Sequence, residues 1–286
     1  MKKKFKVFTF ILSTSIILSA CSGNSVGNKK EVKMGEMMNK GKHIFYVVSN
    51  QQDTKVDAHG RFYEIGEDQD EPMVGTKPSK DTYIDRIIET DNGEMKVYDA
   101  GLNETFDGDK DNEFIKLKDL KDKDDDEIIK MAKERDKENF KRQKKEKVDT
   151  LRADNESTDR VENFKYKKPE KRDAKISVVE DESGNHTAIE RFYLTQNGMG
   201  KEPMNINHNG NMEKDTEYFY KPEDLNSVFM EYDVNNVKPF KIYDKSYVGL
   251  GKKSGDTMLI TKVGNKTEKS KFDEPDSDYV EIDEDS

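Results

Sequence analysis

The chain has 286 residues, a formal net charge of −10, and 38% charged against 32% hydrophobic side chains. So low an apolar content favours one or two small domains with solvated segments over one large core, and the acidic balance argues against nucleic acid as a partner. The single cysteine excludes a disulfide bond within the chain.

The first 20 residues show the three zones of a secretory signal peptide. Four of the first six residues are lysines, and an apolar stretch follows that ends in small residues. This stretch is broken by serine and threonine and is too short for a spanning helix, which needs about 20 mostly apolar residues. We therefore expect residues 1–20 to be removed on export.

The residues Leu18, Ser19, Ala20 and Cys21 resemble the lipobox of bacterial lipoproteins. The resemblance implies that diacylglycerol is attached to the Cys21 thiol and that a peptidase cuts between Ala20 and Cys21. Two acyl chains anchor a protein stably, because each buried methylene contributes about 0.8 kcal/mol. The alternative is an ordinary cleaved signal with a chance cysteine, which would leave an unpaired thiol in an exported chain.

Residues 21–40 are polar and lack apolar periodicity, which predicts a flexible tether. Residues 41–148 are predicted to form a first β-rich region that ends in a charged helix. Within it, the aromatic and β-branched stretch His43–Ser49 is typical of a strand, and Gly60–Ile65 indicates another.

The strongest local signal is a hairpin over Tyr83–Asp99. Asn92 and Gly93 suit a type I′ turn, in which both central residues adopt a positive φ. That turn fixes the pairing of the two strands. The predicted cross-strand pairs are Ile88 with Val97, Glu89 with Lys96, Ile87 with Tyr98, and Arg86 with Asp99.

A charged helix is predicted over Asp124–Val148, capped by Asp124 or Asp125. Acidic residues crowd its first turn and basic residues its last, which complements the helix dipole. Its second half is nearly all polar, so we expect that half to project into solvent or to fray. Residues 149–173 are highly charged and contain a proline, which indicates a linker.

Residues 174–271 are predicted to form a second β-rich region. Its first element is a hairpin of Ile176–Val179 and Ala188–Leu194. Lys221–Tyr232 indicates a short helix. Late strands are expected at Phe240–Tyr243, Tyr247–Leu250 and Thr257–Val263. The last segment, 272–286, is strongly acidic and is predicted to be a solvated, partly disordered tail.

No set of residues predicts catalysis, a metal site or a cofactor. The four histidines are scattered without the spacing of a zinc site, and no serine nucleophile motif is present; the histidines are His43, His59, His186 and His208. The stretch Asp107–Asn112 begins like a calcium loop but has Asn112 where glycine is needed and Lys118 where glutamate is needed. The aromatic run Tyr218–Tyr220 is expected to contribute to a core rather than to grip a partner.

Several segments together resemble a family of uncharacterised lipoproteins of staphylococci and their relatives. The segments that carry the resemblance are Leu117–Leu120, Asp125–Lys133, Gly41–Lys42, Ser183–Thr187, Pro239–Tyr243 and Tyr247–Gly249. The family has no established activity to transfer, so the resemblance implies a functional role only for Cys21. It also implies the outer leaflet of a Gram-positive cell membrane as the location.

Together these observations predict an α+β protein with two β-rich regions of antiparallel hairpins, joined by a charged helix and linker. The expected function is that of a membrane-anchored, surface-exposed lipoprotein that acts as a non-catalytic interaction module. Its expected partners are the membrane, through the diacylglycerol on Cys21, and an envelope or host protein. Two alternatives stay open: a solute-binding lipoprotein of a transporter and an envelope hydrolase.

Overall fold

The computed structural model describes residues 26–49, 55–56, 62–63, 78–101, 115–193, 229–252 and 257–283. The helices are η1 Val26–Asn28, α1 Met34–Asn39, η2 Leu117–Leu120, α2 Asp125–Ala153 and α3 Asp159–Glu162. The strands up to the long helix are β1 Glu31–Lys33, β2 Lys42–Ser49, β3 Lys55–Val56, β4 Phe62–Tyr63, β5 Tyr83–Asp91 and β6 Glu94–Asp99. The later strands are β7 Arg172–Asp173, β8 Lys175–Glu180, β9 Thr187–Tyr193, β10 Phe229–Tyr232, β11 Val234–Ile242, β12 Lys245–Gly251, β13 Thr257–Val263, β14 Lys269–Lys271 and β15 Glu281–Ile282.

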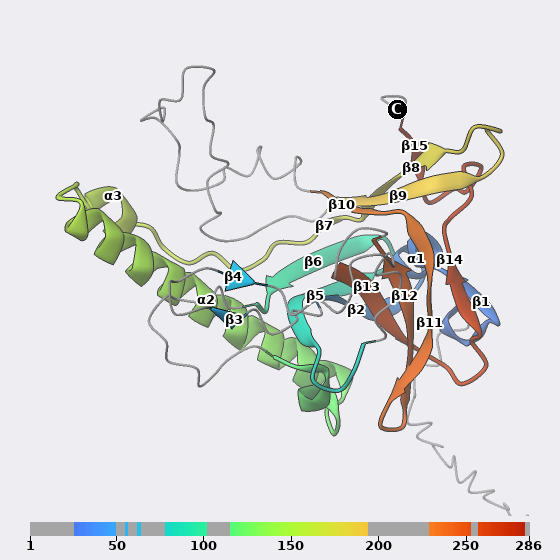
Figure 1. Ribbon diagram of the computed structural model, residues 1–286, viewed down its shortest axis with the longest axis horizontal. Helices are drawn as coiled ribbons and strands as arrows, with labels where there is room; N and C mark the ends of the chain where they lie inside the picture. The colour runs from blue at the N-terminus through green and yellow to red at the C-terminus, as the bar shows by residue number, and fades with distance from the viewer. Residues whose placement is uncertain are drawn as a thin grey trace, which may run out of the picture.

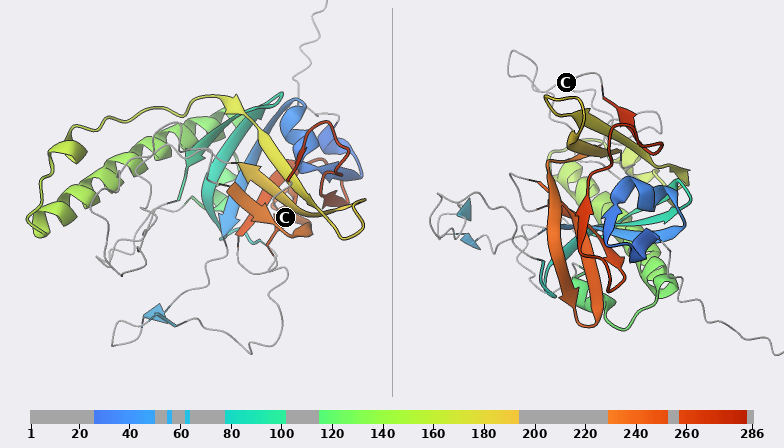
Figure 2. Two further views of the ribbon diagram at one scale, coloured as in Figure 1. Left: turned by 90° about the horizontal axis from the view of Figure 1, so that it is seen from above. Right: turned by 90° about the vertical axis from the view of Figure 1, so that its right-hand side faces the viewer.

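An antiparallel sheet in the order β11-β12-β13-β2-β5-β6-β7 forms the centre of the protein (Figure 1). A smaller sheet in the order β10-β9-β8-β15 lies against one side of it, and the long helix α2 crosses the other side (Figure 2). The predicted α+β class with β-rich antiparallel regions is confirmed.

The central sheet is buried on both faces, because side chains alternate along each strand. Phe45 and Val47 of β2 face a first core, which also takes in the N-terminal segment and the smaller sheet. Tyr46 and Val48 face a second core, which includes Ile128 and neighbouring residues of α2. The middle of β2 is therefore continuously apolar and does not alternate between apolar and polar residues.

The two β-rich regions of the sequence share this sheet. Strand β2, from the first region, pairs with β13, from the second, and Phe45 lies opposite Thr261. The Thr261 hydroxyl donates a hydrogen bond to the Ile44 carbonyl at 2.9 Å. Contacts between segments more than 200 residues apart thus form the middle of the sheet.

The predicted hairpin is confirmed pair by pair. Strands β5 and β6 join Ile88 to Val97 and Arg86 to Asp99, as the turn requires. Asn92 and Gly93 have φ values of 52° and 88°. The Asn92 side chain also accepts a hydrogen bond from the Gly41 N–H at 2.9 Å, so the turn is tied to the start of β2. The second hairpin, β8–β9, and the late strands are confirmed as well.

Helix α2 begins where the sequence predicts and continues beyond it. Asp124 caps the helix by accepting a hydrogen bond from the Glu127 N–H at 2.8 Å, and the Glu127 carboxylate accepts one from the Asp124 N–H at 2.9 Å. The second half does not stand alone in solvent. The chain turns back after α3, and its residues 164–172, called the return segment below, lie along α2, where Phe164 and Tyr166 contact Phe140.

The prediction of a flexible tether over residues 21–40 is wrong for residues 26–40. Val32, Met34, Met37 and Met38 are buried in the first core, and β1 pairs in parallel with β14. The three methionines share one side of the short helix α1, since positions three and four apart face the same way. This apolar side binds the segment to the body.

Two further predictions, one about the second region and one about the acidic C-terminal segment, are also wrong. Residues 229–232, expected at the end of a short helix, form strand β10, which pairs with β9. The acidic segment is not a solvated tail over residues 272–282, because Phe272 and Asp273 are buried and β15 pairs with β8. In both cases pairing with a strand distant in sequence overrides the local signal.

We expect the Gly93→Val variant to unfold more readily than the wild type. A β-branched residue at a φ of 88° costs about 1–2 kcal/mol in backbone strain, and the new Cβ would lie 2.9 Å from Asn39 Oδ1. Thermal denaturation of both proteins measures the effect. Gly93→Asn is the control, because asparagine tolerates a positive φ and should lose less stability. Equal melting temperatures for all three proteins would contradict the turn assignment.

Candidate functional site

The N-terminal segment after Cys21 is fastened to the body at several points. Glu31 pairs with Lys269 at 2.7 Å and with Lys271 at 2.8 Å, and these two hydrogen-bonded ammonium groups lower the pKa of Glu31 to about 2. The Thr267 hydroxyl donates to the Gly27 carbonyl at 3.1 Å. Cys21 and the other lipobox residues lie outside the described residues, and the described chain begins five residues after Cys21.

A buried pair of carboxyl groups, Glu190 and Asp273, lies under the start of α1. Asp273 Oδ2 accepts a hydrogen bond from the Gly35 N–H at 2.7 Å, across 238 residues of sequence. Glu190 Oε2 accepts one from the Asp273 N–H at 3.1 Å, and the two carboxyl groups also bond to each other. This carboxyl pair therefore joins the smaller sheet, the acidic C-terminal segment and the N-terminal segment.

Burial raises the pKa of both members of the carboxyl pair. The neighbouring Asp273 charge raises the pKa of Glu190 further. The hydrogen bond from the Gly35 N–H acts in the opposite direction and lowers the pKa of Asp273. Both side chains are fully buried, and Glu190 Oε1 has no hydrogen-bond partner in the described part of the chain. We infer that Glu190 carries the proton, because an uncharged carboxyl group is the less costly one to bury.

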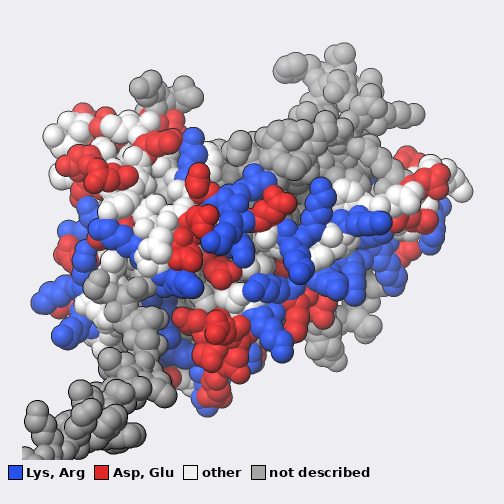
Figure 3. All heavy atoms as spheres, turned by 180° about the vertical axis from the view of Figure 1, so that it is seen from behind, with Lys and Arg blue, Asp and Glu red and all other residues white. Residues whose placement is uncertain are grey.

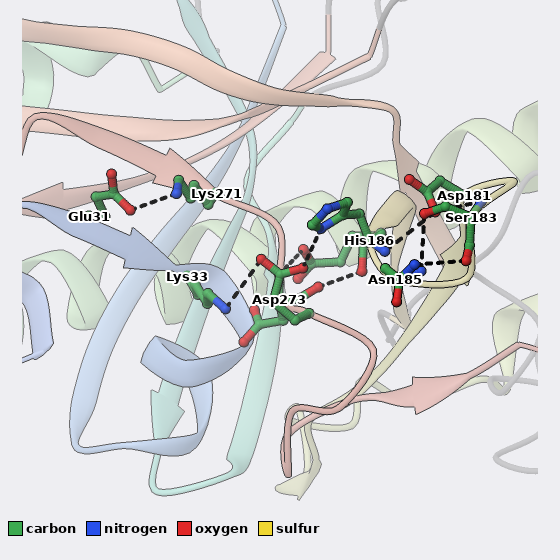
Figure 4. A network of polar contacts seen from close by, with 11 residues as sticks. Glu31, Lys33, Asp181, Ser183, Asn185, His186, Lys271 and Asp273 are labelled. Atoms are coloured by element: carbon green, nitrogen blue, oxygen red, sulfur yellow. Dashed lines mark hydrogen bonds and ion pairs between the residues drawn. The ribbon is translucent and has the colours of Figure 1, made fainter.

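Polar groups on the surface surround the carboxyl pair (Figure 4). Glu274 lies 3.5 Å from His186 Nδ1 and 3.8 Å from Lys33 Nζ. The turn before β9 is held by the Asp181 carboxylate, which accepts a hydrogen bond from the Ser183 hydroxyl at 2.6 Å. The Thr187 hydroxyl donates to the Asp273 carbonyl at 2.6 Å. These contacts hold the turn against the C-terminal segment.

A second group of buried polar side chains fixes α2 to the sheet edge; we call it the α2 acid cluster. Asp136 accepts hydrogen bonds from the Asp99 N–H at 2.9 Å and from the Tyr166 hydroxyl at 2.6 Å. The Asn139 amide donates to the carbonyls of Asp99 and Gly101 at 3.0 and 2.8 Å. The cluster links the helix, the edge strand β6 and the return segment.

Burial is the largest cause that raises the pKa of Asp99 and of Asp136, each to about 6. A carboxyl group with such a pKa has the proton affinity of a general acid or base near neutrality. Asp136 has both oxygens occupied, however, one by a backbone N–H and one by a phenol. The geometry of the cluster therefore fits a role in positioning α2 better than a role in proton transfer.

We expect the stability contributed by the α2 acid cluster to decrease as the pH rises. The folded pKa of Asp136 lies above its ordinary value of 3.8, so folding favours the protonated form, and its contribution is lost between about pH 4 and pH 6. One unit of pKa shift corresponds to about 1.4 kcal/mol, which gives at most about 3 kcal/mol here. Melting temperatures at pH 4 and pH 8 should therefore differ less in Asp136→Asn than in the wild type.

The control for this pH comparison is Asp278→Asn, at an exposed position of the C-terminal segment. Its melting temperature should change with pH as that of the wild type does, because His43 and Glu190 are unchanged in it. If the melting temperature of Asp136→Asn fell as much between the two pH values as that of this control, Asp136 would not titrate between about pH 4 and pH 6.

Few of the residues that the sequence singled out are brought together. The His43 ring is half-buried and makes a 3.1 Å hydrogen bond to the Lys40 carbonyl, whereas His186 is exposed beside Glu274. Burial lowers the pKa of His43. The remaining ones lie outside the described residues: His59, His208, Asp107–Asn112 and Tyr218–Tyr220.

Within the described ranges, no group of three or more histidine, cysteine, aspartate or glutamate side chains could hold a metal ion. The helices of the same part of the chain include none with the length and apolar character of a membrane span. Comparisons with protein-family models, with curated proteins and with solved structures found no match.

Sequence reasoning missed both buried carboxyl groups of the pair. A signal for Glu190 is present, because β9 alternates and Glu190 shares the buried face with Phe192. No comparable signal marks Asp273, which lies in a stretch with many acidic residues. Its partner Gly35 is near the other end of the chain, so only the folded structure shows which of these acids is buried.

Proposed function

We propose that the protein is a lipid-anchored protein of the cell envelope, held by diacylglycerol on Cys21, whose folded part is a non-catalytic interaction module. The proposal rests first on the lipobox-like residues 18–21 after a basic and apolar leader. On this proposal the folded part lies on the extracellular face of the membrane.

The observation that carries the proposal is the start of the fold directly after the lipobox. Val26 is buried and contributes to the first core, so a signal peptidase that cut beyond residue 25 would remove part of that core. A cut between Ala20 and Cys21 leaves every described residue in place. The position of the fold along the chain is thus compatible with the processing that a lipobox implies.

The same observation limits how far the body lies from the anchor. An extended chain spans at most about 3.6 Å per residue, so the five steps from Cys21 to Val26 cover about 18 Å or less. The fastening of β1 to β14 then holds the rest of the N-terminal segment on the body. Such a protein would act close to the membrane surface and in a restricted orientation.

A projecting arm supports the interaction role. Helix α2 extends beyond the sheet, and α3 packs against its far end through Val148, Leu151 and Val161 (Figure 1). Lys144 Nζ binds the carbonyls of Glu162 and Phe164 at 2.6 and 3.0 Å and fixes the return of the chain. The result is a braced arm with a large exposed surface.

Affinity capture from envelope extract and host serum, with the mature chain as bait, together with native mass spectrometry of the purified protein, tests the module. We expect one saturable macromolecular partner that survives washing. A stoichiometric small molecule on the purified protein would favour the solute-binding alternative instead. Turnover of an envelope polymer, lost on a single carboxyl substitution, would favour the hydrolase.

A further inference from the structure

A row of four lysines runs along the exposed side of α2. Lys133, Lys137, Lys141 and Lys145 occupy every fourth position, and all four are exposed. Each lysine of this row lies about 6 Å along the helix axis and about 40° round the helix from the one before it, so the row spans about 18 Å of the axis. None of the four side chains makes a hydrogen bond or an ion pair with the residues that the structure describes.

Helix stability does not explain the lysine row. Like charges four residues apart repel each other and destabilise a helix. Other basic side chains of α2 do have acidic partners. Arg135 lies 3.7 Å from Glu138, Arg142 lies 3.6 Å from Glu146 and Arg152 lies 2.8 Å from Glu162. Acidic residues do lie three or four positions from Lys137, Lys141 and Lys145, namely Glu134, Glu138 and Asp149. The described residues nevertheless form no ion pair with the row, so its charge is available to an anionic partner.

The return segment adds further positive charge beside the row. Phe164 and Tyr166 turn toward α2, whereas the residues between and after them, Lys165, Lys167 and Lys168, are exposed. The return segment contacts Asp136, Phe140 and Lys144 of α2. Lys137, Lys141 and Lys145 each follow one of these residues, and so lie about 100° further round the helix. The row and the return segment therefore form neighbouring parts of one surface.

This surface contrasts with the acidic chain as a whole. Residues 133–147 and 164–172, which hold the whole row and the return segment, contain 13 basic and five acidic side chains, although the chain has a net charge of −10. In Figure 3 lysine and arginine side chains lie across the centre and toward the right, which is the side where α3 lies, and also at the left edge. The arm therefore carries a local basic surface although the chain as a whole is acidic.

The basic surface lies at the far end of the protein from the N-terminal segment. Strand β1 and helix α1 are at one end of the longest axis and α3 is at the other, in Figure 1 and in Figure 2. On the proposed function, the lipid on Cys21 holds the β1 end near the membrane. The arm would then point away from the lipid surface, which favours a polymer in the envelope over lipid headgroups.

We propose that the lysine row and the return segment bind a linear polymer that carries repeated phosphate groups. A regular row of point charges suits a chain with regularly repeated charges, and lysine binds phosphate without the fixed fork geometry of arginine. Binding of this kind depends strongly on salt, because each phosphate neutralised releases a counterion. The choice of a polymer over lipid depends on the proposed anchor, whereas the charge of the surface does not.

Titration of fluorescein-labelled inorganic polyphosphate tests this inference. The processed full chain, extracted from membranes in non-ionic detergent, is compared with a row variant that carries Lys133→Gln, Lys137→Gln, Lys141→Gln and Lys145→Gln. Glutamine keeps the helix propensity of lysine, and circular dichroism checks that α2 is retained. We expect the row variant to bind roughly tenfold more weakly or worse, with a salt slope smaller by about 3 for four lost contacts.

The matched control carries Lys80→Gln, Lys241→Gln, Lys262→Gln and Lys266→Gln. These four lysines are exposed and lie away from the arm, so the control has the same net charge as the row variant. It should bind polyphosphate as the wild type does. Absence of binding by the wild type, or an equal loss in both variants, would overturn the inference.

Detergent micelles that contain phosphatidylglycerol separate a polymer from a lipid surface. At equal phosphate concentration we expect the wild type to bind polyphosphate more tightly than these micelles. The opposite order, abolished in the row variant, would assign the surface to a membrane and overturn the choice of a polymer. Failure of lipid attachment at Cys21 would leave the polyphosphate titration unchanged, so the two proposals fail separately.

Discussion

Cells that produce the Cys21→Ala variant are expected to lose both lipid labelling and membrane retention of the protein. The thiol is the attachment point that the lipobox implies, and without it the protein has no site for the acyl chains that would anchor it. Metabolic labelling with an alkyne fatty acid, followed by fractionation of membrane and medium, measures both effects. We expect near-complete loss of label rather than a partial decrease.

Ser22→Ala is the control for this experiment, because it changes the neighbouring residue and leaves the thiol in place. It should be labelled and retained like the wild type. Retention of the Cys21→Ala protein in the membrane with an uncut leader would indicate anchoring by the leader itself. Continued fatty-acid labelling of that variant would contradict the assignment of Cys21.

The Asp273→Ala variant is expected to be strongly destabilised. The substitution removes the acceptor for the Gly35 N–H and for the protonated Glu190, both of which are buried. Each buried donor that loses its partner costs about 1–3 kcal/mol, so the expected loss is about 2–6 kcal/mol. Denaturant unfolding of the variant and the wild type measures the difference.

Two matched variants separate the buried contacts from a general effect of charge. Asp273→Asn keeps an oxygen that accepts the Gly35 N–H and should lose less stability than Asp273→Ala. Asp278→Ala removes an exposed acid of the same segment and should behave like the wild type. If Asp273→Ala were no less stable than Asp278→Ala, the C-terminal segment would not be fastened in the way described.

Local patterns in the sequence were sufficient to predict the elements whose contacts join residues close together in the chain. The β5–β6 hairpin follows from Asn92 and Gly93, because a two-residue turn sets every later pair. The start of α2 follows from Asp124 and Glu127, which cap each other's backbone. The lysine row also follows from spacing alone once the helix is recognised.

The N-terminal and C-terminal segments could not be placed in this way. Met34, Met37 and Met38 form an apolar side on a helix of only six residues, which is too short to give a clear period. Asp273 looks like any other acid of the last segment until the fold brings it to Gly35. The information that fixes both segments lies in contacts between the ends of the chain, which no local pattern contains.

Mass spectrometry of the N-terminal tryptic peptide of the mature protein tests lipid anchoring directly. We expect a peptide that begins at Cys21, ends at Lys29 and carries a diacylglyceryl group on the Cys21 sulfur. A mature chain that begins beyond Cys21, or a peptide that spans the intact Ala20–Cys21 bond, would contradict lipid anchoring at this residue.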